Sequence, residues 1–260
     1  MKTSAELTSA VNMSFDSQGF IKRTLVLGYG IFGYAVGCFG LFWLILAAGG
    51  LAPAGISLWQ ASSPLIAMLT NVGLIGLFGL QHSVMARRGF KNWLKTLLPE
   101  AVERSTYILM SGIATCTLMY YWQSVPGMVW QVESFTMTAI LCSLYGIGTM
   151  YLLLSTFVTN HFELMGLRQV YLYFCNTPYT ALSFTNKYMY RYSRHPMMLG
   201  MLVLLWSTPE MSASRFILAM LFTMYIAVGI YFEERDLVRS FGDTYRKYKQ
   251  QIAAFLPGIF

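Results

Sequence analysis

Charged residues are scarce in this sequence. Of its 260 residues only 11% are Asp, Glu, Lys or Arg, whereas 56% are hydrophobic, and the mean hydropathy is +0.51. Soluble globular domains carry about 25% charged residues, so the composition excludes that class and predicts an integral membrane protein. Because apolar runs of helical length recur along the chain, we expect an all-α fold.

Paired cysteines and metal-ligand motifs are also missing. The four Cys are scattered, without a CxxC pair, so we expect no disulfides. His82, His161 and His195 share no local ligand spacing, and we expect no bound metal. Residues 1–20 lack a charged stub followed by an apolar core, so we expect no cleavable signal peptide.

Apolar segments divide the chain. We expect about six transmembrane or membrane-embedded helices, at residues 25–51, 64–84, 105–122, 137–158, 196–208 and 214–232. The fifth segment has about 13 residues, or roughly 20 Å of helix, which is short of the ~30 Å hydrocarbon core. Five spans with a re-entrant hairpin are therefore the alternative.

The basic residues that give the net charge of +7 lie in the segments between spans. They gather after the second span, between the fourth and fifth, and in the C-terminal tail, so the positive-inside rule places both termini in the cytoplasm. This distribution follows membrane orientation and does not indicate a nucleic-acid partner. We expect one membrane domain, residues 1–260, composed of a polar tail (1–24), four spans (25–158), a cytoplasmic active-site loop (159–195), a helical hairpin (196–232) and a cytoplasmic C-terminal helix and tail (233–260).

Charged residues flank the terminal hairpin. Arg194 and His195 precede its first segment, and Glu233 and Glu234 follow its second. If the two segments are antiparallel helices, these side chains meet at one membrane face. Acidic side chains at a helix C-terminus interact unfavourably with the helix dipole unless a cation neutralises them. We therefore predict the functional site at the foot of the hairpin, which is the end where these four residues lie.

Three C-terminal motifs resemble the isoprenylcysteine carboxyl methyltransferase and phospholipid methyltransferase superfamily: RHPMMLG (194–200), EERDL (233–237) and FGDTYRKY (241–248). Upstream, LQHSVMARRGFKNW (80–93), ERSTY (103–107) and STFVTNHFELMGLRQV (155–170) are similar to the bacterial methanethiol S-methyltransferases. The resemblance covers about residues 70–250. It implies an integral membrane enzyme that takes its methyl group from S-adenosylmethionine.

The resemblance also implies site residues. The cofactor would be held by Tyr190, Arg194, His195, Gly200, Glu233 and Glu234, with Tyr245 as an aromatic face for a cation. Glu233 or Glu234 suits its ammonium, and Arg194 or His195 its carboxylate. Because a thiolate is the nucleophile, we expect catalysis to involve His161 or His82 as base and Arg104 or Arg168 as its stabilising cation, beside Arg194 and Glu234.

The implied reaction is methylation of methanethiol to dimethyl sulfide in a bacterial inner membrane. The partners would be a small volatile thiol and membrane lipids. One alternative is a larger lipid, prenyl-cysteine or thiol substrate. A second is a non-enzymatic membrane accessory protein, because the upstream half also resembles a membrane family associated with nitrite reduction.

Overall fold

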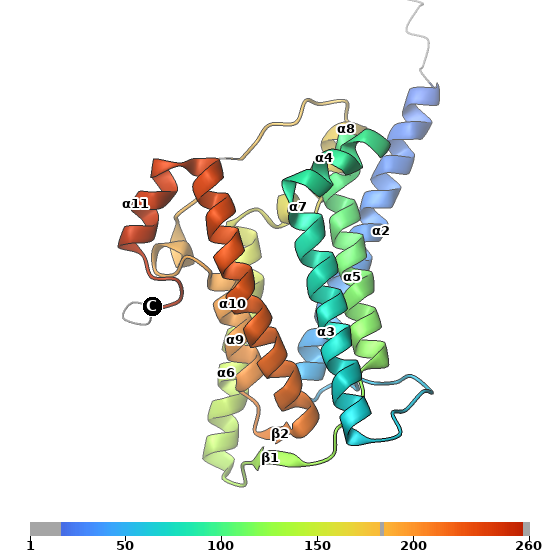
Figure 1. Cartoon of the computed structure of the whole chain (residues 1–260). Helices are drawn as coiled ribbons and strands as arrows, with labels where there is room; N and C mark the ends of the chain where they lie inside the picture. The colour runs from blue at the N-terminus through green and yellow to red at the C-terminus, as the bar shows by residue number, and fades with distance from the viewer. Residues whose placement is uncertain (1–16, 183–184, 257–260) are drawn as a thin grey trace, which may run out of the picture.

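The computed structural model describes residues 17–182 and 185–256. Six helices form a bundle (Figure 1): α2 (Ser17–Ala48), α3 (Pro64–Ala86), α5 (Glu103–Tyr121), α6 (Phe135–Val158), α9 (Pro196–Trp206) and α10 (Ala213–Phe241). The shorter helices are α4 (Arg88–Leu97), η1 (Glu100–Val102), α7 (His161–Leu164), α8 (Leu167–Phe174), η2 (Tyr188–Arg191) and α11 (Asp243–Gln251). Two short strands, β1 (Met128–Gln131) and β2 (Glu210–Ser212), pair antiparallel.

The helix lengths and compositions confirm an all-α membrane protein. Four helices, α2, α3, α6 and α10, are long and apolar enough to cross a membrane. Most of their apolar side chains face outward, where lipid replaces water as the solvent; in the apolar window of α6 only 11% of residues are buried. α2 begins at Ser17, so the last part of the expected polar tail is helical; residues 1–16 lie outside the described chain.

The fifth apolar segment does not cross as a helix on its own. Pro196 occupies the first turn of α9, and the helix ends at Trp206 after 11 residues, about 16 Å of rise. Residues 207–212 then continue in extended form to β2. Ser212 caps α10 by accepting a hydrogen bond from the Arg215 amide. α9 and the extended segment together return the chain to the start of α10.

The sixth apolar segment is longer than predicted. Its helix was expected to end at Phe232, but α10 continues to Phe241. The acidic residues therefore lie inside the helix, where they form ion pairs with cations from other segments. Asp236, for example, lies 3.0 Å from Arg87. The C-terminal helix expected within residues 233–260 is divided in two, because Gly242, with φ +55°, separates α10 from α11.

Close helix pairs build the bundle around small residues. An added Cβ at Gly112 of α5 would lie 2.8 Å from Gly37 Cα of α2, and one at Gly200 of α9 would lie 2.7 Å from the Gly148 carbonyl of α6. Small residues let helix backbones approach this closely. A buried cluster containing Leu44, Leu118, Met119, Leu204 and Phe222 fills the space between the pairs.

The two ends of the bundle differ in structure. The β1–β2 ribbon closes one end, and α4, α7, α8 and α11 gather at the other together with the start of α2 (Figure 1). The end with the short helices carries most of the basic segments. The expected loop over residues 159–195 is partly helical, since it contains α7, α8 and η2.

Candidate active site

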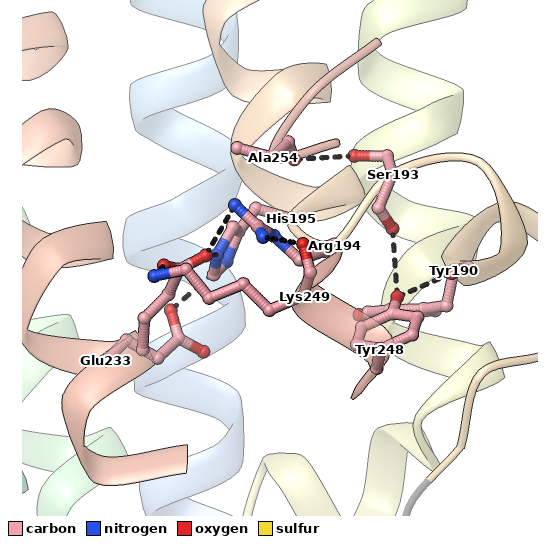
Figure 2. Close-up of polar contacts among 9 residues, drawn as sticks. Tyr190, Ser193, Arg194, His195, Glu233, Tyr248, Lys249 and Ala254 are labelled. Atoms are coloured by element: carbon pink, nitrogen blue, oxygen red, sulfur yellow. Dashed lines mark hydrogen bonds and ion pairs between the residues drawn. The ribbon is translucent and has the colours of Figure 1, made fainter. Parts of the chain in front are cut away.

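Glu234 is the centre of a buried charged cluster, and Figure 2 shows its partners Arg194, His195 and Lys249 close together. Its side chain is 9% exposed, and its Oε1 lies 2.9 Å from Arg194 Nη2 and 3.3 Å from His195 Nε2. Lys249 Nζ of α11 donates to the other carboxylate oxygen. The hairpin thus brings together the residues predicted at its foot, and α11 adds a cation that the sequence did not predict.

The segment after α11 fixes the entry to α9. The amides of Arg194 and His195 donate to the carbonyls of Ala253 and Ala254, at 3.0 and 3.1 Å. Arg194 Nη1 donates to the Lys249 carbonyl at 2.9 Å. The hydroxyl of Tyr248 donates to the carbonyl of Tyr190, which ties α11 to η2 (Figure 2). The two amide contacts hold the backbone of the arginine and histidine in place, and the contact with the Lys249 carbonyl orients the guanidinium.

Two polar groups at this cluster are left available. The Glu233 side chain is 47% exposed, and among the described residues its one ion-pair contact is with His195 Nδ1, at 3.6 Å. Arg194 Nε is buried and has no hydrogen-bond partner among the described residues. A carboxylate and an unpaired guanidinium N–H in one cluster match the ammonium and carboxylate of an amino-acid moiety. The residues present therefore fit S-adenosylmethionine.

His195 is buried between the two glutamates. Burial lowers its pKa, but the hydrogen bonds to Glu233 and Glu234 raise it by more, so the net pKa lies above the usual value. Both glutamates therefore favour the protonated form of the ring, which would add a cation to the cluster.

Tyr190, Tyr245 and Gly200 surround the cluster in different ways. Burial raises the pKa of Tyr190 to about 12, so its hydroxyl stays protonated near neutral pH. Tyr245 is 1% exposed, packs on Tyr248 with ring centroids 5.8 Å apart, and feels the charge of Glu234. Gly200 lies one turn into α9, and its nearest neighbours are backbone atoms of α6. The contact seen for Gly200 is thus helix packing.

The histidines do not converge. His82 Nε2 lies 2.6 Å from the Tyr107 hydroxyl and its Nδ1 lies 3.0 Å from Ser111 Oγ, both on α5. His161 Nε2 lies 2.9 Å from the Tyr34 hydroxyl of α2, and its Nδ1 lies 2.9 Å from Thr156 Oγ1. Burial lowers the pKa of His161. Within residues 17–182 and 185–256, no group of three His, Cys, Asp or Glu side chains is placed to hold a metal.

A cavity of about 740 Å³ lies between α4, α5, α7 and α8, and we call it the polar cavity because charged side chains line it. Its wall includes Arg104, Thr159 and Glu163 together with the lysines of α4. Thr159 also hydrogen-bonds to the Tyr190 side chain, which connects the cavity to the cluster. A second, apolar cavity of about 520 Å³ lies between α2 and the α7–α8 segment.

Sequence reasoning missed Lys249, Tyr107 and the tie between Tyr248 and Tyr190. A partial signal for Lys249 was its position directly after the FGDTYRKY motif, four residues after the buried Tyr245 on the same helical face. Tyr107 closes the quoted ERSTY motif, but its hydrogen bond to His82 joins residues 25 apart in sequence. No local pattern reports such a contact.

The fold and the cluster define a multi-pass α-helical membrane protein with a buried charged site at one end of its bundle. The protein-family model described as NnrU protein matches residues 70–255 of this chain. Because that range exceeds half of the chain, the chain belongs to the NnrU protein family.

Relatives cover nearly the whole chain. It is 39% identical to the methanethiol S-methyltransferase of Crocosphaera subtropica over 94% of this chain and 96% of the relative. It is 40% identical to the protein of the same name from Mycobacterium tuberculosis, over 91% and 98% respectively. It is also 30% identical to nurim from Bos taurus, over 68% and 71%. No solved structure matches the chain.

Proposed function

We propose that this protein transfers a methyl group from S-adenosylmethionine to methanethiol and releases dimethyl sulfide. The observation that carries the proposal is that one cluster contains both an exposed carboxylate, on Glu233, and a buried N–H donor without a hydrogen-bond partner among the described residues, at Arg194 Nε. Relatives that match more than nine-tenths of the chain bear the name methanethiol S-methyltransferase, which gives the thiol substrate.

The two glutamates would divide their work. Glu234 already binds Arg194, His195 and Lys249, so it organises the cations of the site. Glu233 has the freer carboxylate and would bind the cofactor's ammonium, while Arg194 would bind its carboxylate. Tyr190 and Tyr245 would line the same pocket, and Gly200 would allow α9 its approach to α6.

When bound, S-adenosylmethionine supplies a methyl group on a positively charged sulfur. The protein's contribution is then positioning and exclusion of water, because an in-line displacement needs aligned reactants and little covalent machinery. Burial of His195 and Glu234 at 4% and 7% exposure keeps water away from this end of the hairpin.

The base remains a choice between His82 and His161. Both ring nitrogens of each histidine are hydrogen-bonded to hydroxyl groups. A proton that either ring accepts can therefore move on only along one of these hydrogen bonds. His82→Ala and His161→Ala enzymes separate the two by the pH dependence of turnover. If both variants keep wild-type turnover and pH dependence, neither histidine is the base.

We place the protein in the bacterial inner membrane with the site in the cytoplasm. The basic segments lie at the end of the bundle that holds the site, which is the cytoplasmic end by the positive-inside rule. Cys175, exposed just after α8 at that end, reports the orientation. A membrane-impermeant maleimide should label it in inverted vesicles and not in spheroplasts, and a Cys175→Ser protein identifies the labelled band.

Headspace gas chromatography tests the reaction. Detergent-purified protein with methanethiol and S-adenosylmethionine should release dimethyl sulfide, and Glu234→Ala should abolish it. Glu133→Ala is the matched control, because Glu133 is exposed in the linker after β1 and should leave the rate unchanged. Absence of product from wild-type protein that binds the cofactor would refute methanethiol as substrate.

The two alternatives predict different results in this assay. A larger lipid or prenyl-cysteine substrate would bind in the apolar cavity between α2 and α8, and the product would be a methylated lipid instead of dimethyl sulfide. An accessory role would give no binding of S-adenosylmethionine by calorimetry. The family description names no reaction, so cofactor binding decides between enzyme and accessory protein.

A further inference from the structure

Two arginines were candidates to stabilise the thiolate, and the structure separates them. Arg168 is paired with a carboxylate: Nη1 lies 2.8 Å from Glu163 Oε2, and the guanidinium also donates to the carbonyl and hydroxyl of Thr180 at 2.9 and 2.8 Å. Its charge is compensated by Glu163, and both of its Nη atoms have hydrogen-bond partners. Arg168 therefore fastens the segment around Thr180 to α7 and has little left for a ligand.

Arg104 is held in place but keeps its charge uncompensated. Its Nε donates to the Leu164 carbonyl at 2.7 Å, and its guanidinium lies 5.1 Å from the centre of the Tyr107 ring. In the described part of the chain, no carboxylate lies within ion-pair distance of it. The lysines on the same cavity wall differ, since Lys95 pairs with Glu100 at 2.5 Å and Lys91 with Glu103 at 3.5 Å.

Arg104 also faces a cavity that is open to water. It lines the polar cavity and lies against the Tyr107 ring. Its charge acts on the Tyr107 hydroxyl and on His82, and the charge of Glu233 acts on the same hydroxyl. The guanidinium is thus within reach of a small ligand in the cavity and within the electrostatic range of the region that holds the carboxylate assigned to the cofactor.

We infer that Arg104 binds the thiolate of the substrate and stabilises its negative charge. The inference rests on the proposed function and names a catalytic residue for it. An anchored, stacked guanidinium with unused N–H donors provides such a contact without moving during the reaction.

The charges balance. The thiol gives its proton to the base, for which His82 and His161 are the candidates named above. The thiolate sulfur then forms the new carbon–sulfur bond to the donated methyl group, and the electron pair of the broken bond stays on the donor sulfur. One negative and one positive charge cancel. Both products, dimethyl sulfide and the donor thioether, carry no charge at the reacting sulfur, so Arg104 no longer attracts the product.

Other ionisable groups near Arg104 leave this charge in place. Glu103 precedes it on α5 but faces the α4 lysines, and Glu163 of α7 faces Arg168 and Tyr179. His82 of α3 and Tyr107 bond to one another. The Glu233 carboxylate of α10 also acts on the Tyr107 hydroxyl, and the cofactor's ammonium would neutralise that carboxylate.

The test compares two nucleophiles of the same shape. Methaneselenol is far more acidic than methanethiol, so it is ionised without help from a cation. In Arg104→Gln, kcat for methanethiol at neutral pH should fall by about 10- to 1000-fold, and the acid limb of its pH profile should move to higher pH. The kcat for saturating methaneselenol should stay within about twofold of wild type.

Controls keep the outcomes distinct. Arg104→Lys should retain part of the methanethiol rate, and Arg168→Gln should leave the pH profile and the ratio between the nucleophiles unchanged. Affinity for S-adenosylmethionine, measured by calorimetry, should match wild type and verifies the fold. An equal fall for both nucleophiles, or an unmoved pH profile, would overturn the role of Arg104. No product from wild type would instead refute the proposed function.

Discussion

Arg194 and Glu234 lie 2.9 Å apart, although 40 positions separate them in sequence. The pair joins the residue at the entry to α9 to the last turns of α10, and both side chains are about one-tenth exposed. His195 and Lys249 complete the surroundings of the same carboxylate. The charged site is therefore also a structural joint between α9, α10 and α11.

Glu234→Gln should destabilise the protein. Glutamine keeps the shape of the side chain but leaves Arg194 and Lys249 without their counter-charge, and breaking a buried ion pair costs about 3 kcal/mol. Thermal unfolding in detergent micelles measures the effect. An unfolding temperature equal to that of wild type would show that the joint contributes no stability.

Glu233→Gln should weaken the cofactor without unfolding the protein. Its carboxylate is exposed and its ion-pair contact with His195 is long, at 3.6 Å, so little native stability depends on it. A lost charge-assisted hydrogen bond of about 1.5–3 kcal/mol lowers affinity about 10- to 100-fold. Calorimetric titration with S-adenosylmethionine reports this loss. Unchanged affinity would move the ammonium to another group.

Stability should depend on pH through His195. Its pKa in the folded state lies above the usual value of 6.5, so the protonated ring stabilises the fold fully below about pH 6.5. That contribution is lost as pH rises through the folded-state pKa. The wild-type unfolding temperature should thus fall as the pH rises above about 6.5, more steeply than that of His195→Gln. Equal slopes would contradict the protonated histidine.

Gly200→Ala should push α9 away from α6. The added Cβ would lie 2.5 Å from the Leu152 amide nitrogen, which is backbone and cannot turn aside. Overpacking of this kind costs about 1–3 kcal/mol and should lower the unfolding temperature and the methylation rate together. Gly146→Ala, on the outward face of α6 with no atom within 4 Å, is the matched control and should change neither.

The spans were predictable because long apolar runs have few other uses. α3 and α6 lie within two residues of their expected bounds. The end of α10 was not predictable in the same way. Glu233 to Asp236 form a charged run that normally ends a membrane span, but charge alone does not end a helix. Their partners on distant segments, Arg87, Arg194 and Lys249, are not visible in a local pattern.

The site was predictable where its residues flank one hairpin. Arg194, His195, Glu233 and Glu234 meet because α9 and α10 are neighbours in sequence and in space. The polar cavity depends on α4, α5, α7 and α8, which are brought together by packing over more than 60 residues. The choice between Arg104 and Arg168 likewise depends on hydrogen bonds that no local pattern reveals.

The most direct test follows the methyl group itself. Purified wild-type protein is given methanethiol and S-adenosylmethionine that carries a trideuterated methyl group, and the headspace is analysed by mass spectrometry. The account predicts dimethyl sulfide with one deuterated and one ordinary methyl group, formed in proportion to enzyme. Folded protein that binds the cofactor and yields no labelled dimethyl sulfide would contradict it.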